Sequence, residues 1–235
     1  MDEGHDQLWG ILVVSYSQLA ERCQIVLPDA LRYLLNDGKT RYGTDTADWR
    51  KHWRSYMLAG TPAFSCVYDF EWLDPERAAD TVEEWLNPIY QGGRKFLPFA
   101  RSGAGDAYCL TPLANGDIGV ALIWHDKERS SIGDASFEAF AYRILVESAW
   151  DCEHLLGDDF TIGEARECVI AGMLSVAAYL PDRMRIALLQ LTVEASRSDA
   201  HQDQIITEQQ AEAALNILPR IDGQMFPIVP RWECK

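Results

Sequence analysis

A histidine and an aspartate stand side by side at the end of an apolar run, and they form the most enzyme-like pair in the chain. His125 and Asp126 directly follow Trp124, where a strand beginning at Ile118 is expected to end. An imidazole and a carboxylate presented to one pocket can exchange protons or bind a metal that activates water. The other histidines form no set at ligand spacing: His5, His52, His154 and His201. We therefore expect His125 to be a hydrogen-bonded, non-catalytic residue, and a hydrolase using this pair is the least favoured hypothesis.

The segment FLPFARSGAGDAYCLTP, residues 96–112, raises a second kind of chemistry, because closely spaced glycines can cradle a phosphate. A dinucleotide-binding fingerprint requires a third glycine three residues after Gly105, followed by a helix whose N-terminus holds the anion. Tyr108 occupies that position, and the residues after it alternate like a strand. Gly103 and Gly105 are thus expected to bend the backbone, with Asp106 as a candidate to brace the bend.

Other catalytic and cofactor signatures are missing from the sequence. Gly38-Lys39-Thr40 is similar to the end of a nucleotide-binding P-loop, but the glycine that this motif needs five positions before Gly38 is Tyr33. The six cysteines are spread singly, with no C-x-x-C pair and no histidine at zinc spacing. Neighbouring acids such as Glu83 and Glu84 are typical of a solvated face in so acidic a chain. The sequence therefore predicts no enzyme, no cofactor and no metal site.

Composition and charge restrict the classes of partner. The chain has 235 residues, of which 48% are hydrophobic, so it is expected to fold around a real core. Its 36 acidic residues outnumber 21 basic ones, giving a formal charge of -15, and this charge disfavours nucleic acids and anionic membranes as partners. The N-terminus carries Asp2, Glu3 and Asp6 where a signal peptide has basic residues, and no apolar run approaches the ~20 residues of a membrane span. We expect a cytoplasmic protein with no membrane association.

Helix and strand signals place the candidate residues in an α+β domain. Asp74 and Pro75 are a helix start signal, and Asn115-Gly116 is a turn signal between two apolar strands. Helices are predicted over residues 27–38, 46–58, 75–86 and 134–150, and strands over 108–111 and 118–124. The last helix has an apolar face formed by Phe137, Phe140, Ile144 and Leu145. This order predicts a mostly antiparallel sheet with helices packed on it.

A change in composition at Gly157–Asp159 marks the start of a second segment, which is mostly helical. Thr161 with Glu164 and Thr207 with Gln210 have the spacing of capping boxes. Residues 181–196 fit a helix begun by Pro181, although IALLQLTV, residues 186–193, also fits a strand. The tail is expected to be irregular and to lie across the core through Phe226, Ile228 and Trp232. We divide the chain into an α+β domain, residues 1–157, and a helical C-terminal extension, residues 158–235.

Ordered features between residues 25 and 150 resemble one family, the SUKH superfamily. LPDALRYLLNDG, residues 27–38, resembles its early helix, and FLPFARSGAGDAYCLTPLANGDIGVALIWHD followed by SFEAFAYRIL resembles its central block. By position, the family's Gly-Asp step falls on Gly105 and Asp106, and its strand-end motif on Trp124, His125 and Asp126.

The resemblance implies a non-enzymatic α+β protein that needs no cofactor and binds other proteins. Members of the superfamily include fungal cell-wall regulators and many bacterial immunity proteins encoded beside polymorphic toxins. An immunity protein binds its cognate toxin domain, frequently a nuclease, and blocks it. The implied function is thus toxin neutralisation, and the alternative is a regulatory or scaffold module that binds endogenous proteins.

An acidic surface is the expected means of binding, since a nuclease toxin needs a basic cleft for its own substrate. Opposite fields accelerate encounter and select against wrong partners. Acids on loops and turns, together with an aromatic anchor, are the candidate partner contacts: Asp69, Glu71, Trp72, Asp74, Asp106, Asp117, Asp126 and Glu128.

Overall fold

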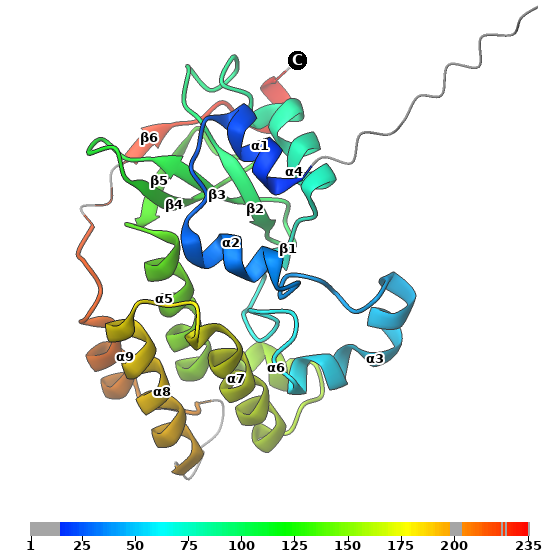
Figure 1. Ribbon diagram of the computed structural model, residues 1–235, viewed down its shortest axis with the longest axis vertical. Coiled ribbons are helices and arrows are strands. Elements are labelled where there is room, and N and C mark those ends of the chain that lie inside the picture. Colours follow the sequence, from blue (N-terminus) through cyan, green and yellow to red (C-terminus); the bar gives the residue numbers. More distant parts are fainter. Residues whose placement is uncertain (1–14, 198–203, 222, 224, 235) are drawn as a thin grey trace, which may run out of the picture.

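The computed structural model describes residues 15–197, 204–221, 223 and 225–234; the acids and the apolar run near the N-terminus, residues 2–14, lie outside these residues. In the described part, six strands form one antiparallel sheet in sequential order (Figure 1). The strands are β1 (Glu71–Trp72), β2 (Leu97–Arg101), β3 (Ala107–Pro112), β4 (Ile118–Ile123), β5 (Arg129–Asp134) and β6 (Met225–Pro227). The α+β fold is confirmed, with a sheet in which every pairing is antiparallel.

Helices account for the rest of the architecture. The first are α1 (Tyr16–Cys23), α2 (Asp29–Asn36), α3 (Thr46–Leu58) and α4 (Pro75–Thr81), which continues as a π-helical turn (Val82–Leu86). They are followed by α5 (Phe137–Trp150), α6 (Glu153–Gly157), α7 (Ile162–Ala177), α8 (Asp182–Arg197) and α9 (Glu208–Leu215). The predicted helices over 27–38, 46–58, 75–86 and 134–150 are confirmed. Asp74 caps α4 by accepting a hydrogen bond from the Arg77 N–H at 2.8 Å.

The central hairpin β3–β4 forms as its sequence predicts. Gly116 takes φ +90° in the turn, a conformation that glycine adopts at little cost. Cys109 pairs with Ala121 and Leu110 with Val120 across the hairpin. Because successive strand residues point to opposite faces, Leu110 and Val120 enter the larger core while Cys109 and Ala121 enter a smaller one.

Both faces of the sheet are covered. On the larger-core side lies α5, whose Phe137 and Phe140 rings pack against Phe99 with centroids 5.4 and 5.5 Å apart. On the other side, Trp85 from the π-helical turn and Phe226 from β6 close a separate cluster. A β-strand covered on both faces needs apolar side chains in both directions, which explains the nearly continuous apolar run in β4.

The C-terminal helices pack around α5 (Figure 1). Both predicted capping boxes are present, at Thr161 and at Thr207. Residues 181–196 form a helix, not a strand, and its buried Leu188 and Leu191 join the same hydrophobic cluster as Phe140 of α5. The boundary after residue 157 stays a prediction, but the helices on its two sides share one core.

The tail follows its prediction only in part. Phe226 and Ile228 are buried as expected, and Phe226 lies in β6, which pairs with β5 at the sheet edge. The prediction for Trp232 is wrong, because 57% of this residue is exposed within the short 3-10 helix Arg231–Glu233. Strand β5 was also absent from the prediction, since its sequence RSSIGD lacks the apolar residues that signal a strand.

Candidate functional site

The strand register places most of the candidate residues at one end of the sheet. Glu71 pairs with Arg101, Ala107 with Ile123, and Arg129 with Pro227, so the connections beyond these pairs meet at the same end. This sheet end carries Asp69 before β1, Asp106 between β2 and β3, and two residues between β4 and β5. Those two are Asp126 and Glu128. Asp117 lies at the opposite end, in the turn between Pro112 and Ile118.

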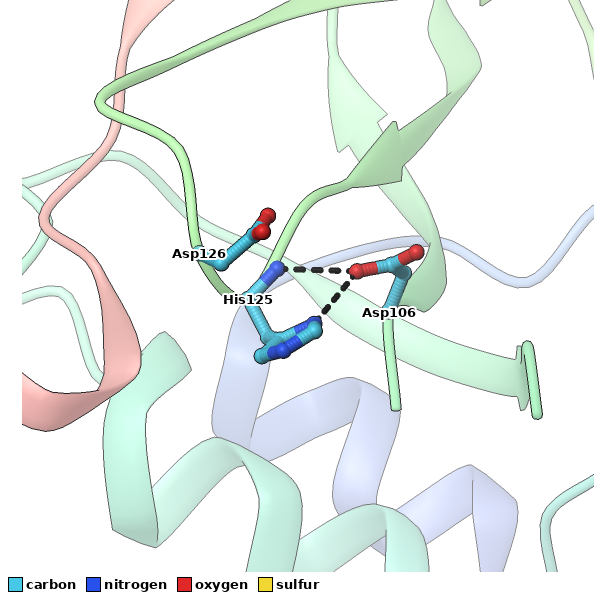
Figure 2. Close-up of side chains that lie close together, drawn as sticks. All are labelled: Asp106, His125 and Asp126. Carbon is cyan, nitrogen blue, oxygen red and sulfur yellow. Dashed lines mark hydrogen bonds and ion pairs between the residues drawn. The ribbon is translucent and has the colours of Figure 1, made fainter. Parts of the chain in front are cut away.

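A buried carboxylate organises this sheet end. Asp106 is 4% exposed, and one of its oxygens accepts hydrogen bonds from the His125 backbone N–H at 3.0 Å and from ring Nδ1 at 2.7 Å (Figure 2). Its other oxygen accepts a hydrogen bond from Ser102 Oγ at 3.1 Å, and the Asp106 N–H donates back to that hydroxyl. Asp106 therefore ties the β2–β3 bend to the β4–β5 turn. The expectation that it braces the glycine bend is confirmed, and it is not an exposed partner contact.

Asp106, His125 and Asp126 have the donor types of a small metal site. Their ligand atoms lie within 4.8 Å of one another, and Asp126 follows His125 on the same turn (Figure 2). However, both oxygens of Asp106 already accept hydrogen bonds from the protein, and so its charge is used to hold the turn. A divalent ion bound through all three side chains would have to displace the Asp106–His125 bond. The geometry thus fits a structural brace better than a metal centre.

The glycines of the bend serve backbone geometry. Gly105 takes φ +95°, and the Gly103 N–H donates to the Asp69 carboxylate. The bend leads into strand β3 and not into the N-terminus of a helix. A side-chain carboxylate occupies the position where a phosphate would bind to the Gly103 N–H. This contact argues directly against a phosphate-binding role.

A groove of about 850 Å³ runs beside the edge strand β1. It lies between the start of α1 and α2 on one side, the connection from α2 to α3 on another, and β1 with the start of α4 on the third. Its aromatic lining comes from four residues, Tyr16, Tyr42, Trp49 and Trp72. Polar and charged side chains, among them Arg41 and Glu71, line it as well. A concave surface that combines aromatic walls with polar groups is typical of binding sites.

Hydrogen bonds hold the groove in shape. The Tyr42 hydroxyl accepts the Trp72 N–H at 2.8 Å, and the ring of Tyr42 meets that of Trp49 edge to face at 4.9 Å. The Tyr16 hydroxyl donates to the Leu73 carbonyl at 2.7 Å. Burial raises the pKa of both tyrosines well above the usual range, so they stay neutral. The two tyrosines thus form a neutral, preorganised part of the groove wall.

A carboxylate in the first turn of α3 fixes the connection between α2 and α3. Asp48 accepts the Thr44 N–H at 2.9 Å and the Tyr56 hydroxyl at 2.6 Å. These hydrogen bonds, the Thr44 N–H foremost, hold the pKa of Asp48 well below its usual range. Asp45 caps α3 through the Ala47 and Asp48 N–H groups. A binding surface that is ordered in advance loses less conformational entropy when it binds.

Charges surround the groove in a mixed pattern. Glu71 forms ion pairs with Arg77 at 3.3 Å and Arg101 at 2.7 Å, and Arg77 also approaches Asp74 at 3.5 Å. Exposed Glu76 lies on the same wall as these residues. Because Glu71 lines the groove and also stands at the sheet end, the two surfaces are continuous.

The predicted contacts divide into three groups. Asp69, Asp74, Asp117, Asp126 and Glu128 are exposed, and Glu71 is half-buried. Trp72 is a correction: it is 4% exposed, and its indole N–H donates to the Ala63 carbonyl at 2.6 Å, so it cannot act as an exposed anchor. It packs among Phe64 and Phe70 because a large apolar ring on a short edge strand is covered by the preceding loop.

Sequence reasoning missed the part of the groove between α2 and α3. Tyr42, Trp49 and Arg41 line it, and none of them was a candidate. The signal was present in the density of aromatic residues from 42 to 72. That density has no helix or strand period, because these rings meet across a loop, and periodicity detects only faces of regular elements.

The fold and these surfaces define a protein with an antiparallel sheet, a helical layer and a preformed groove of the kind that binds other molecules. A family model described as SMI1 / KNR4 family (SUKH-1) matches residues 16–143. Since the match spans more than half of the chain, the protein belongs to this family, as the sequence resemblance predicts. Comparison with curated proteins gave no match, and comparison with solved structures gave none.

The matched region contains strands β1 to β5 and nearly all of the groove, and it stops within α5. Helices α6 to α9 lie beyond it. Membership of this family is consistent with binding to other proteins. No helix in the described part of the chain is both long and apolar enough to cross a membrane.

Proposed function

We propose that this protein is an immunity protein, which binds a cognate bacterial toxin domain and neutralises it without catalysis. The binding surface in this proposal is the groove beside β1 together with the adjacent sheet end. The partner is a basic protein domain, such as a nuclease that must attract phosphate. The protein is proposed to act in the cytoplasm, where such a toxin would damage its own cell.

The convergence of exposed acids beside a preformed groove carries this proposal. Asp69, Asp126 and Glu128 lie at the sheet end, and Asp74 and Glu76 lie on the groove wall, in a chain whose formal charge is -15. Acids at the rim of an interface chiefly accelerate association, while an apolar and aromatic floor supplies contact area. This combination suits a protein that must capture its target quickly and hold it.

The test is co-expression with the toxin domain encoded beside the gene. The intact protein is expected to restore growth to cells that make the active toxin, and the purified pair should associate more slowly as salt rises. Absence of rescue, with the toxin shown to be active and this protein shown to be folded, would reject the proposal.

Neutralising exposed acids at the site makes the test specific. The triple variant Glu76→Gln, Asp126→Asn, Glu128→Gln should slow association with the toxin domain by about tenfold at low salt. A matched control removes the same charge from α7, α9 and the α6–α7 connection: Glu167→Gln, Glu212→Gln and Asp158→Asn. Equal slowing by both variants would show that only net charge matters and would contradict a local site.

A regulatory or scaffold module binding endogenous proteins is the alternative. The helical segment after the matched region favours it, because added helices often supply binding grooves. A pull-down that returns housekeeping proteins, from a genome with no toxin gene beside this one, would support the alternative over immunity.

A further inference from the structure

Helix α8 has two apolar faces, and the described part of the chain covers only one of them. Leu188, Leu191 and Ala195 are buried against the rest of the molecule. On the other side Ile186, Leu189 and Val193 are 61%, 39% and 46% exposed. Their spacing places these three side chains in a single line along the helix.

This line of side chains, which we term the α8 stripe, is longer than scattered surface residues explain. Single exposed apolar residues are common on proteins, but contiguous patches mark interaction surfaces. The side chain of Gln210 from α9 donates to Glu194 at 3.1 Å, so α9 covers one flank of α8 and leaves the stripe open. Leu174 on the neighbouring helix α7 is also 52% exposed.

The charges at the two ends of the α8 stripe identify the partner. Asp182 lies four residues before Ile186, and Arg197 lies four residues after Val193, so both extend the same line. In an antiparallel pair of identical helices, each residue faces the one equally distant from the centre. Ile186 of each copy then faces Val193 of the other, and Asp182 of each copy faces Arg197 of the other. The stripe is thus complementary to itself in shape, polarity and charge.

We propose that the α8 stripe is an interface with a second copy of this chain, formed by antiparallel packing of α8 about a two-fold axis near Leu189. Such an interface is isologous, which means that both copies use the same surface. The local ion pair of Asp182 with Arg185, at 2.8 Å, is solvent-exposed and contributes little, so Asp182 is available to the partner's Arg197. The dimer leaves the groove and the sheet end outside the interface.

Sedimentation velocity of the full chain, over a dilution series, tests the proposal. We expect a reversible monomer–dimer equilibrium, in about the micromolar range because one helix pair is a small interface. Ile186→Glu should raise the dissociation constant at least about tenfold. Ile89→Glu is the matched control, since Ile89 is 86% exposed elsewhere and should leave the equilibrium unchanged. Circular dichroism and thermal melting confirm that each variant is folded.

A charge exchange tests the antiparallel geometry. Asp182→Arg alone places arginine opposite arginine at both ends and should weaken the dimer. Arg197→Asp alone places aspartate opposite aspartate and should weaken it as well. The double variant Asp182→Arg, Arg197→Asp restores opposite charges at both ends and should recover most of the lost affinity. Monomers at every concentration, a dimer indifferent to Ile186→Glu, or a double variant no better than the single ones would each overturn the proposal.

Discussion

A single carboxylate oxygen of Asp106 accepts hydrogen bonds from two groups of His125, the backbone N–H at 3.0 Å and ring Nδ1 at 2.7 Å. The two residues are 19 positions apart and belong to different strand connections. This contact makes the β4–β5 turn dependent on the β2–β3 bend.

Asp106→Ala is therefore expected to lower the free energy of unfolding by about 2–3 kcal/mol, because it removes a buried charged acceptor and leaves its donors unpaired. Urea denaturation measures the change. Asp126→Ala, at the exposed neighbour of His125, should change stability by less than about 0.5 kcal/mol. An equal loss in both variants would contradict the bracing role of Asp106. Metal-dependent hydrolysis that His125→Ala abolishes would instead support the hydrolase hypothesis.

Gly60 links the first part of the chain to the C-terminal helices. Its φ is +65°, and a Cβ there would lie 2.4 Å from the carbonyl oxygen of Ala171 in α7. Gly60→Ala must strain the backbone and also push α7 away, which should cost about 3 kcal/mol or more. Gly92→Ala is the control, because Gly92 has φ +61° with no atom within 4 Å of the added Cβ. Thermal unfolding should show that Gly92→Ala lowers the free energy of unfolding much less, by about 1 kcal/mol. Similar losses in the two variants would mean that α7 moves away from residue 60 at little cost.

His154 is expected to make the free energy of unfolding depend on pH. Burial lowers the pKa of this histidine, and ring Nε2 donates to the Cys66 carbonyl at 3.0 Å. The unfolded chain binds the proton more readily than the folded one, so stability is complete above about pH 6.5 and falls as the pH drops below that value. His154→Gln, which can keep a donor to Cys66, should flatten this decline. Urea midpoints at a series of pH values between about 7.5 and 5 test it, and an undiminished decline in the variant would exclude His154 as its source.

The indole N–H of Trp72 donates to the Ala63 carbonyl from within the core. Trp72→Phe removes this donor and some packing volume, and it should cost about 2 kcal/mol of stability. Trp232→Phe alters a ring that is 57% exposed and should cost little. If Trp72 acts only by supporting the groove wall, the folded Trp72→Phe protein should still bind its partner at temperatures well below its Tm. Calorimetric titration of the variant with its partner at low temperature measures this. Loss of binding by the folded variant would show that Trp72 contacts the partner directly.

Local signals in the sequence were sufficient for most of the regular elements. Helix α3 covers the predicted residues 46–58. The capping boxes at Thr161 and Thr207 form as their spacing indicates, because each depends on residues within one turn. The Asn115-Gly116 turn likewise determines the β3–β4 hairpin, and the resemblance over residues 25–150 predicted the family that the model match shows.

Tertiary structure alone decided what each residue contacts. Trp72 and Asp106 were both candidate surface contacts, yet both are buried. Trp72 is enclosed by the loop before β1 and by Phe99 of β2, and Asp106 bonds to His125 from another strand connection. The apolar pattern within residues 181–196 fits both a helix and a strand. Packing of Leu188 and Leu191 against α5 and α7 stabilises the helix. Strand β5 has little strand propensity of its own and forms because β4 and β6 supply hydrogen bonds on both sides. Contacts between distant segments carry no local pattern, and so the groove beside β1 could be found only in the folded chain.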